Sequence, residues 1–71
     1  MYAILGAKWC ASCVKLKERL GNRDDIKFLD IDEPNAFNLF CKLRLNHGVK
    51  TIPTILKYEN DDVIIITEED L

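Results

Sequence analysis

Two short apolar runs near the start of the chain are separated by a segment with helical periodicity. The first run is Tyr2–Leu5 and the second is Ile26–Ile31. Between them, apolar side chains recur at the spacing of one helix face, at Cys13, Leu16 and Leu20. This spacing predicts an amphipathic helix over residues 11–20. A strand, a helix and a strand in this order predict two parallel strands joined by a right-handed crossover.

The second half of the chain predicts one more helix and an antiparallel hairpin. Asp32-Glu33-Pro34 indicates a helix start, because acids and an early proline favour the first turn. The end of this helix is predicted at Asn46-His47-Gly48, and its buried face is predicted from five apolar residues, Ala36, Phe37, Phe40, Cys41 and Leu43. After it, the segments Ile55–Tyr58 and Val63–Ile66 are predicted as strands joined by the polar turn Glu59–Asp62.

The order of these elements, β-α-β-α-β-β, predicts a single α/β domain over residues 1–71 with a four-stranded mixed sheet. Thr67 and Asp70 have the spacing of a capping box, but the sequence ends at Leu71, so we expect a truncated last helix. With little of that helix present, we expect incomplete cover on one face of the sheet. We therefore expect a monomer of marginal stability, unless a second copy or further chain beyond Leu71 covers this face.

The charge balance of the chain argues against two classes of partner. Lys and Arg total 10 and Asp and Glu total 12, which gives a net charge of -2. Nucleic acids and acidic membrane surfaces are bound largely through basic patches, so we expect neither as a partner. No apolar run approaches the roughly 18 to 20 residues that span a bilayer, and the start of the chain lacks the basic segment of a signal peptide. We therefore predict a cytoplasmic protein.

Cys10 and Cys13 lie where the first helix is expected to start. A disulfide between them would close a four-residue loop, worth about 2 kcal/mol of loop entropy, so chemistry explains the pair better than stabilisation does. A cysteine at a helix N-terminus meets free N–H groups and the positive end of the helix dipole, which favour the thiolate. We predict Cys10 as the nucleophile and Cys13, one turn inside the helix, as the resolving thiol. Lys8 either adds positive charge beside Cys10 or is a solvated loop cation, and both readings stay open.

Three segments of the chain resemble the thioredoxin and glutaredoxin superfamily. They are Trp9-Cys10-Ala11-Ser12-Cys13, Phe28–Asp32 and Gly48–Thr54, in the order and at the distances typical of that family. The resemblance implies a thioredoxin-like fold and a thiol–disulfide oxidoreductase that reduces protein disulfides by dithiol exchange. It also implies a cis Ile52-Pro53 bond beside the cysteine pair, where the backbone of Ile52 pairs with an extended substrate segment or with glutathione.

The same resemblance implies the substrate surface and the partners. Trp9, Thr51, Ile52 and Pro53 are the expected substrate-binding residues. The expected partners are disulfide-containing proteins, together with a thioredoxin-reductase-type protein or glutathione as the reductant. No bound cofactor and no metal are expected.

The chain departs from both branches of the superfamily at three places. Thioredoxins carry a buried acid six residues before the first cysteine, where this chain has Ile4. Glutaredoxins carry a Gly-Gly-x-Asp type turn before the last helix, where this chain has Ile66-Thr67-Glu68-Glu69-Asp70. The motif interior, Ala11-Ser12, is neither Gly-Pro nor Pro-Tyr. These departures predict a hybrid, glutaredoxin-sized protein with thioredoxin-like surface features.

Two alternative functions remain open at this point. A thioredoxin-like domain can serve as a binding module without turnover. A structural zinc site is the other alternative, and its Cys3His set would be Cys10, Cys13, Cys41 and His47. Positions 41 and 47 are separated by about 240° around a helix, which disfavours a shared metal. We expect Cys41 to pack in the core and His47 to mark a helix end.

Overall fold

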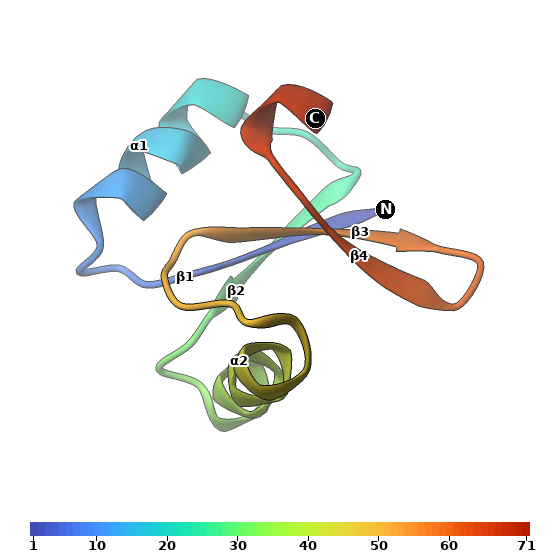
Figure 1. Cartoon of the computed structure of the whole chain (residues 1–71). Coiled ribbons are helices and arrows are strands. Elements are labelled where there is room, and N and C mark those ends of the chain that lie inside the picture. Colours follow the sequence, from blue (N-terminus) through green and yellow to red (C-terminus); the bar gives the residue numbers. More distant parts are fainter.

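The computed structural model describes all 71 residues and contains two helices, four strands and a final helical turn (Figure 1). The predicted order β-α-β-α-β-β is confirmed. The elements are β1 (Tyr2–Gly6), α1 (Ala11–Leu20), β2 (Ile26–Asp30), α2 (Pro34–His47), β3 (Thr54–Glu59), β4 (Asp62–Ile66) and the 3-10 turn η1 (Glu68–Asp70).

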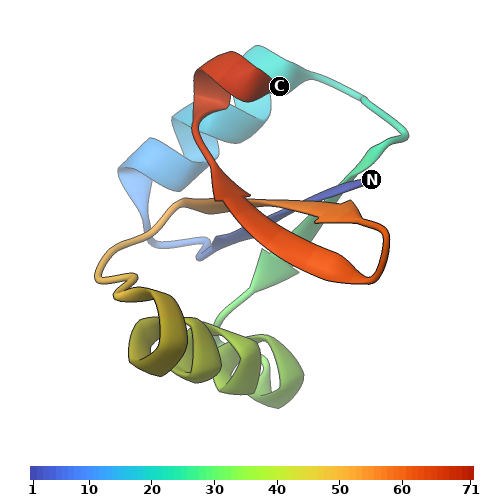
Figure 2. The same ribbon diagram turned by 45° about the vertical axis from the view of Figure 1, so that its right-hand side comes forward.

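The four strands form one mixed sheet in the order β2-β1-β3-β4. β1 and β2 are parallel, as the intervening helix predicts, whereas β1–β3 and β3–β4 are antiparallel. In two views, α1 and η1 lie on one side of the sheet and α2 lies on the other (Figures 1 and 2). The protein is therefore a small α/β fold with a helix on each face of a four-stranded mixed sheet.

β1 is the central element of the core because its side chains are buried on both faces of the sheet. Successive residues of a strand point to opposite faces. Ala3 and Leu5 therefore face α2, where they pack with Leu56, Ala36, Phe40 and Leu43. Ile4 faces α1 and packs with Leu16, Ile26 and Ile55.

The predicted buried face of α2 is partly wrong. Ala36, Phe40 and Leu43 are buried, but Phe37 is 51% exposed and Cys41 is only half-buried. The buried residues have the spacing i, i+4, i+7, which places them within one stripe of the helix. Phe37 follows Ala36 by about 100° and is turned away from the sheet. Cys41, one turn beyond Phe37, lies at the margin of the buried stripe.

The last turn of the chain is tied to α1 and to the loop before β2. The Asp70 carboxylate accepts hydrogen bonds from the Thr67 N–H and hydroxyl, each at 3.3 Å, so the acid of the expected capping box does cap this turn. The Arg19 guanidinium donates two hydrogen bonds to the Glu68 carboxylate, at 2.9 and 2.8 Å. Only a single 3-10 turn follows Thr67.

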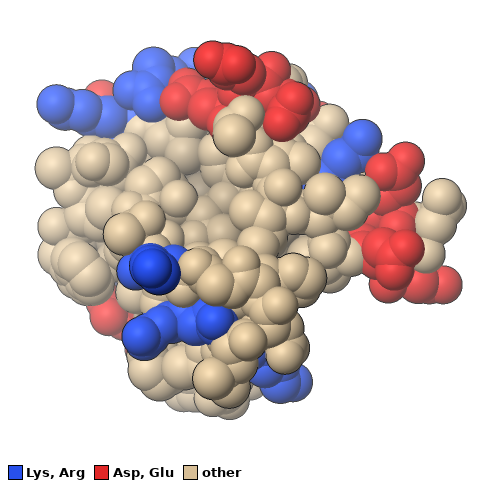
Figure 3. Space-filling model, in the orientation of Figure 1, with Lys and Arg blue, Asp and Glu red and all other residues tan.

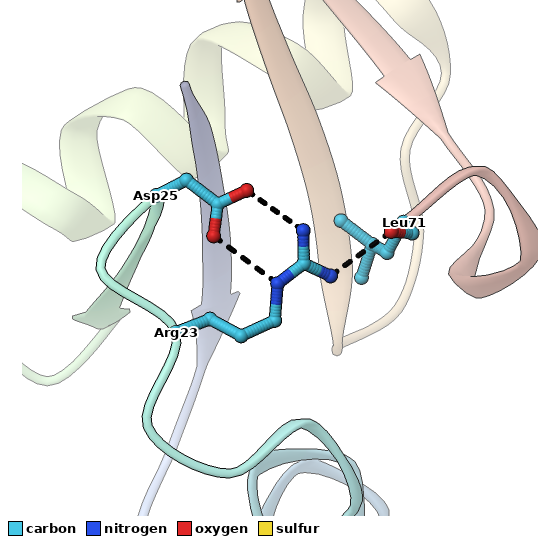
Figure 4. Close-up of polar contacts among 3 residues, drawn as sticks. All are labelled: Arg23, Asp25 and Leu71. Carbon is cyan, nitrogen blue, oxygen red and sulfur yellow. Dashed lines mark hydrogen bonds and ion pairs between the residues drawn. The ribbon is translucent and has the colours of Figure 1, made fainter.

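Arg23 joins the loop before β2 to the last residue of the chain (Figure 4). Its guanidinium donates to both carboxylate oxygens of Asp25, at 3.1 and 2.7 Å, and to the backbone oxygen of Leu71 at 2.9 Å. The Leu71 side chain packs against the core on the α1 side of the sheet. These contacts hold η1 over that face.

No helix of the structure is long and apolar enough to cross a membrane.

The two-sided core predicts a sharp contrast between two leucines. Leu56 is fully buried between the sheet and α2, whereas Leu45 on α2 is 86% exposed. Leu56→Ala removes packed methyl groups and leaves a cavity, so we expect a loss of about 2–5 kcal/mol in the free energy of unfolding. The matched control, Leu45→Ala, should change it by less than about 0.5 kcal/mol. Urea unfolding followed by circular dichroism measures both, and equal losses would contradict the assigned core.

Candidate active site

Cys10 occupies the N-cap position of α1, where the sequence predicts it. Its backbone is extended, with φ -93° and ψ 109°, and the Cys13 backbone N–H donates a hydrogen bond to its Sγ at 3.3 Å. The Cys10 N–H in turn donates to the Ala7 carbonyl at 3.2 Å. The Cys10 side chain is half-buried, so its sulfur lies at a helix N-terminus with a backbone N–H directed at it.

Cys13 lies one helical turn further along and is buried, with 8% of its surface exposed. Burial, and after it a side-chain hydrogen bond with Cys10, raise the pKa of its thiol from 9.0 to about 11. A thiol with this pKa is protonated at neutral pH. The two cysteines therefore differ in environment, with one sulfur at the helix terminus and the other shielded beneath it.

Gly6 at the end of β1 makes room for Cys13, and sequence reasoning missed this role. A Cβ atom on residue 6 would lie 3.0 Å from the Cys13 Sγ and 3.1 Å from its Cβ. Atoms of that size are rarely so close in a packed interior, so only glycine fits without moving Cys13. In the sequence, Gly6 is visible only as the residue that ends the first strand.

Trp9 is 67% exposed and precedes Cys10 at the surface, so it is not a core residue. Its indole N–H donates to the Asp32 carboxylate, at 3.1 Å to one oxygen and 3.4 Å to the other. Asp32 is held in turn by its own N–H, which donates to the Asp30 carboxylate at 2.9 Å. Sequence reasoning assigned Asp32 only to the start of the second helix, and its spacing from Trp9 gave no sign of the contact.

The Ile52-Pro53 peptide bond is cis and lies in the turn before β3. The Thr54 hydroxyl donates to the Thr51 carbonyl at 2.8 Å across this turn. Pro53 and Thr51 line a groove of about 430 Å³ whose other walls come from Ser12 and Leu16 of α1 and from Ile66, Thr67 and Glu68. Ser12 follows Cys10 by two residues in the chain, but neither Cys10 nor Cys13 lines the groove.

The predicted substrate-binding residues are only partly brought together. Thr51 and Pro53 line the groove, but the Ile52 side chain packs against the core on the α2 side of the sheet. Trp9 does not line the groove. Only the backbone of Ile52, and not its side chain, is therefore available for the predicted substrate binding.

A second hollow, of about 670 Å³, lies on the opposite side of α1 and reaches Cys13. Lys8 lines this hollow and not the groove, and it has no acidic partner within ion-pair distance. Ile4, at the position of the buried acid of thioredoxins, is 2% exposed and lines the same hollow. β1 therefore offers Cys13 no carboxylate.

The ligands of the zinc alternative are not brought together. Cys41 and His47 lie on α2, across the sheet from α1 and Cys13 (Figure 1). The structure contains no group of three or more His, Cys, Asp or Glu side chains that could hold a metal.

Comparison of the chain with protein-family models, with curated proteins and with solved structures finds no match. The proposed function therefore rests on the geometry of the cysteine pair, the cis proline turn and the groove between Ser12 of α1 and Pro53.

The raised pKa of Cys13 predicts how its alkylation depends on pH. Iodoacetamide reacts with the thiolate, so the labelling rate of Cys13 should rise about tenfold per pH unit and level off near pH 11. Folding stability should fall over the same window, from about pH 9 to about pH 11, because the folded state holds a proton there that the unfolded state has lost. Peptide mapping by mass spectrometry measures the labelling rate.

A Cys10→Ala variant tests what causes the raised pKa of Cys13. Burial is the largest contribution, so the Cys13 pKa should fall in this variant but stay above 9.0. A plateau near pH 9 in the unmodified protein would show that Cys13 is not shielded as the structure has it.

Proposed function

We propose that this protein is a thiol–disulfide oxidoreductase of the thioredoxin and glutaredoxin type that reduces protein disulfides through Cys10 and Cys13. The observation that carries the proposal is the asymmetry of the pair. The sulfur of Cys10 accepts the Cys13 N–H at 3.3 Å at a helix N-terminus, while the Cys13 thiol is buried and has a pKa raised to about 11. This arrangement suits one attacking thiolate and one resolving thiol.

A minimal thioredoxin-like fold is part of the same proposal. It is supported by the mixed sheet in the order β2-β1-β3-β4 and by the cysteine pair at the start of α1. The cis Ile52-Pro53 bond before β3, across the groove from Ser12, supports it as well. The cis bond was expected from the resemblance of the sequence to that superfamily, whereas the strand order was not predicted.

In the first step, the Cys10 thiolate attacks one sulfur of the substrate disulfide. A mixed disulfide forms, the substrate S–S bond breaks, and the second substrate sulfur leaves as a thiolate that takes up a proton from water. In the second step, Cys13 loses its proton and its sulfur attacks Cys10. The Cys10–Cys13 disulfide forms, the first substrate sulfur leaves, and two electrons have passed from the protein to the substrate.

The pKa of Cys13 provides the timing of these two steps. Two of the causes that raise it, the hydrogen bond and the charge interaction with Cys10, depend on a free Cys10 sulfur. Both are lost when that sulfur is bonded to the substrate, so the Cys13 pKa falls once the mixed disulfide has formed. Cys13 therefore stays protonated before the first step and becomes easier to ionise before the second.

The substrate surface in this proposal consists of Trp9 beside Cys10 and of Thr51, Pro53 and the Ile52 backbone along the groove. The electrons return from glutathione or from a thioredoxin-reductase-type protein. Both donors operate in the cytoplasm, where thiols are kept reduced, and we place the reaction there.

Three single cysteine variants test the proposed roles. In reduction of insulin by dithiothreitol, Cys10→Ser should fall to the uncatalysed rate, because the attacking sulfur is gone. Cys13→Ser should trap a mixed disulfide with the substrate, visible by mass spectrometry. Cys41→Ser is the matched control, and it should keep full activity because Cys41 lies on α2 across the sheet. Full activity of Cys10→Ser would refute the mechanism, and no activity in the unmodified protein would favour the binding-module alternative.

The reduction potential of the pair gives a second test. As a hybrid of the two branches, the protein should have a potential between about -270 and about -200 mV. Equilibration in glutathione buffers, followed by fluorescence of the exposed Trp9 next to Cys10, measures it. A potential more oxidising than about -150 mV would contradict a reductase.

A further inference from the structure

β4 forms one edge of the sheet, and only one of its sides is paired. Between Asp62 and the end of the strand, its residues are all apolar and β-branched, Val63, Ile64, Ile65 and Ile66. Ile64 is 44% exposed and Ile65, which points to the opposite face, is 39% exposed. An edge strand of this kind is a template for pairing with another extended chain.

The turn before β4 shows which backbone groups point away from the sheet. Asn60 and Asp61 have φ values of 49° and 68°, as in a two-residue type I′ turn, and Glu59 pairs with Asp62. Such a turn makes Glu59 and Asp62 a hydrogen-bonded pair, and hydrogen-bonded and non-hydrogen-bonded pairs then alternate along the hairpin. The N–H and C=O groups of Val63 and Ile65 therefore point outward, to the side without a neighbour.

The other edge strand, β2, is protected, whereas β4 is not. β2 carries the charged residues Lys27 and Asp30, and the Lys17 ammonium lies over its Phe28 ring at 5.3 Å. Charged side chains on an edge discourage pairing with another strand. β4 has no lysine and no proline, and its register with β3 runs without a bulge from Asp62 to Ile66.

Acidic side chains flank the apolar stretch of β4 at both ends. Glu59, Asp61 and Asp62 lie at the hairpin turn, and Glu68, Glu69 and Asp70 lie in η1. Figure 3 shows red areas at the top and on the right, separated by uncharged surface and a smaller blue area. Two of these acids are paired within the chain, Glu59 with Lys57 at 3.7 Å and Glu68 with Arg19 at 2.8 Å. The other four have no cation within ion-pair distance.

The acids at both ends of β4 favour a different protein, and not a second copy of the chain, as the partner of this edge. Two copies paired antiparallel about Ile64 would place Asp62 of each opposite Ile66 of the other. The acidic turn of each copy would then approach the acidic η1 of the other, and like charges repel there. A segment with basic residues at both ends meets opposite charges instead.

We propose that the β4 edge binds an extended segment of a partner protein, which adds to the sheet as a fifth strand. The segment has β-branched residues in its middle and Lys or Arg at both ends. The outward N–H and C=O groups of Val63 and Ile65 supply the main-chain pairing, and the flanking acids select the charge. This interaction uses no cysteine, although Ile66 and Glu68 also line the groove of the candidate active site.

Binding of two labelled peptides to the unmodified protein tests the charge selection. The peptides are Lys-Lys-Val-Thr-Val-Thr-Val-Lys-Lys and its counterpart with glutamate at both ends, and fluorescence anisotropy measures their Kd. We expect the lysine peptide to bind at least about tenfold more tightly, with an affinity that falls as the salt concentration rises. Equal affinities, or no binding of the lysine peptide, would overturn the proposal.

A proline at an outward-facing position tests the main-chain pairing. Val63→Pro removes one outward N–H and leaves the ladder with β3 intact, so the lysine peptide should bind about tenfold more weakly. Val63→Thr keeps the N–H and the branched shape, and should bind as the unmodified protein does. Circular dichroism checks that both variants are folded, and unchanged binding to a folded Val63→Pro would refute strand addition.

N-methylated peptides give the same test without altering the protein. Alternate residues of a strand face one neighbour. One peptide is methylated at its three valine N–H groups and a second at its two threonine N–H groups. Only one of these two sets faces β4, so only one of the two peptides should lose binding. Loss of binding in neither case would overturn the proposal.

Sedimentation of the protein alone is the last check, because a dimer that the lysine peptide does not dissociate would assign the edge to a second copy.

Discussion

Burial of β1 on both faces is the constraint on which the rest of the structure depends. Ala3 and Leu5 on one side and Ile4 on the other join the two core clusters, and β1 pairs with both β2 and β3. A chain of 71 residues has little apolar surface to bury, and β1 contributes buried side chains to the core on both faces of the sheet. The positions of both helices follow from it, because each covers one of its faces.

The candidate site is a direct continuation of this strand. β1 ends at Gly6, and the short loop after it leads to Cys10 at the N-cap of α1. The missing side chain of Gly6 leaves the space that the Cys13 sulfur occupies. The burial that stabilises the start of α1 also raises the pKa of the Cys13 thiol. The two thiols, three residues apart on one helix, thus have different environments.

Periodicity predicted the elements well because each strand and helix here carries its own local pattern. The parallel β1–β2 pair followed from the crossover rule, whereas the strand order β2-β1-β3-β4 was not predicted. The interpretation of α2 was less accurate, because Phe37 is apolar yet lies about 100° away from the buried stripe. Apolar character alone could not show which stripe of the helix faces the sheet. The contact between Trp9 and Asp32 was also beyond the sequence, because the two residues are far apart along the chain.

The sequence by itself determined the order of the elements, the position of the cysteine pair at a helix start and the resemblance that led to the proposed reaction. These are local properties, set by side-chain spacing and by the residues at the ends of each element. The tertiary structure decided the contact of Gly6 with Cys13, the groove between Ser12 and Pro53, and the exposed edge of β4. Each of these depends on segments that are distant in the chain and meet only when the sheet forms, because burial of one set of side chains determines which others remain exposed.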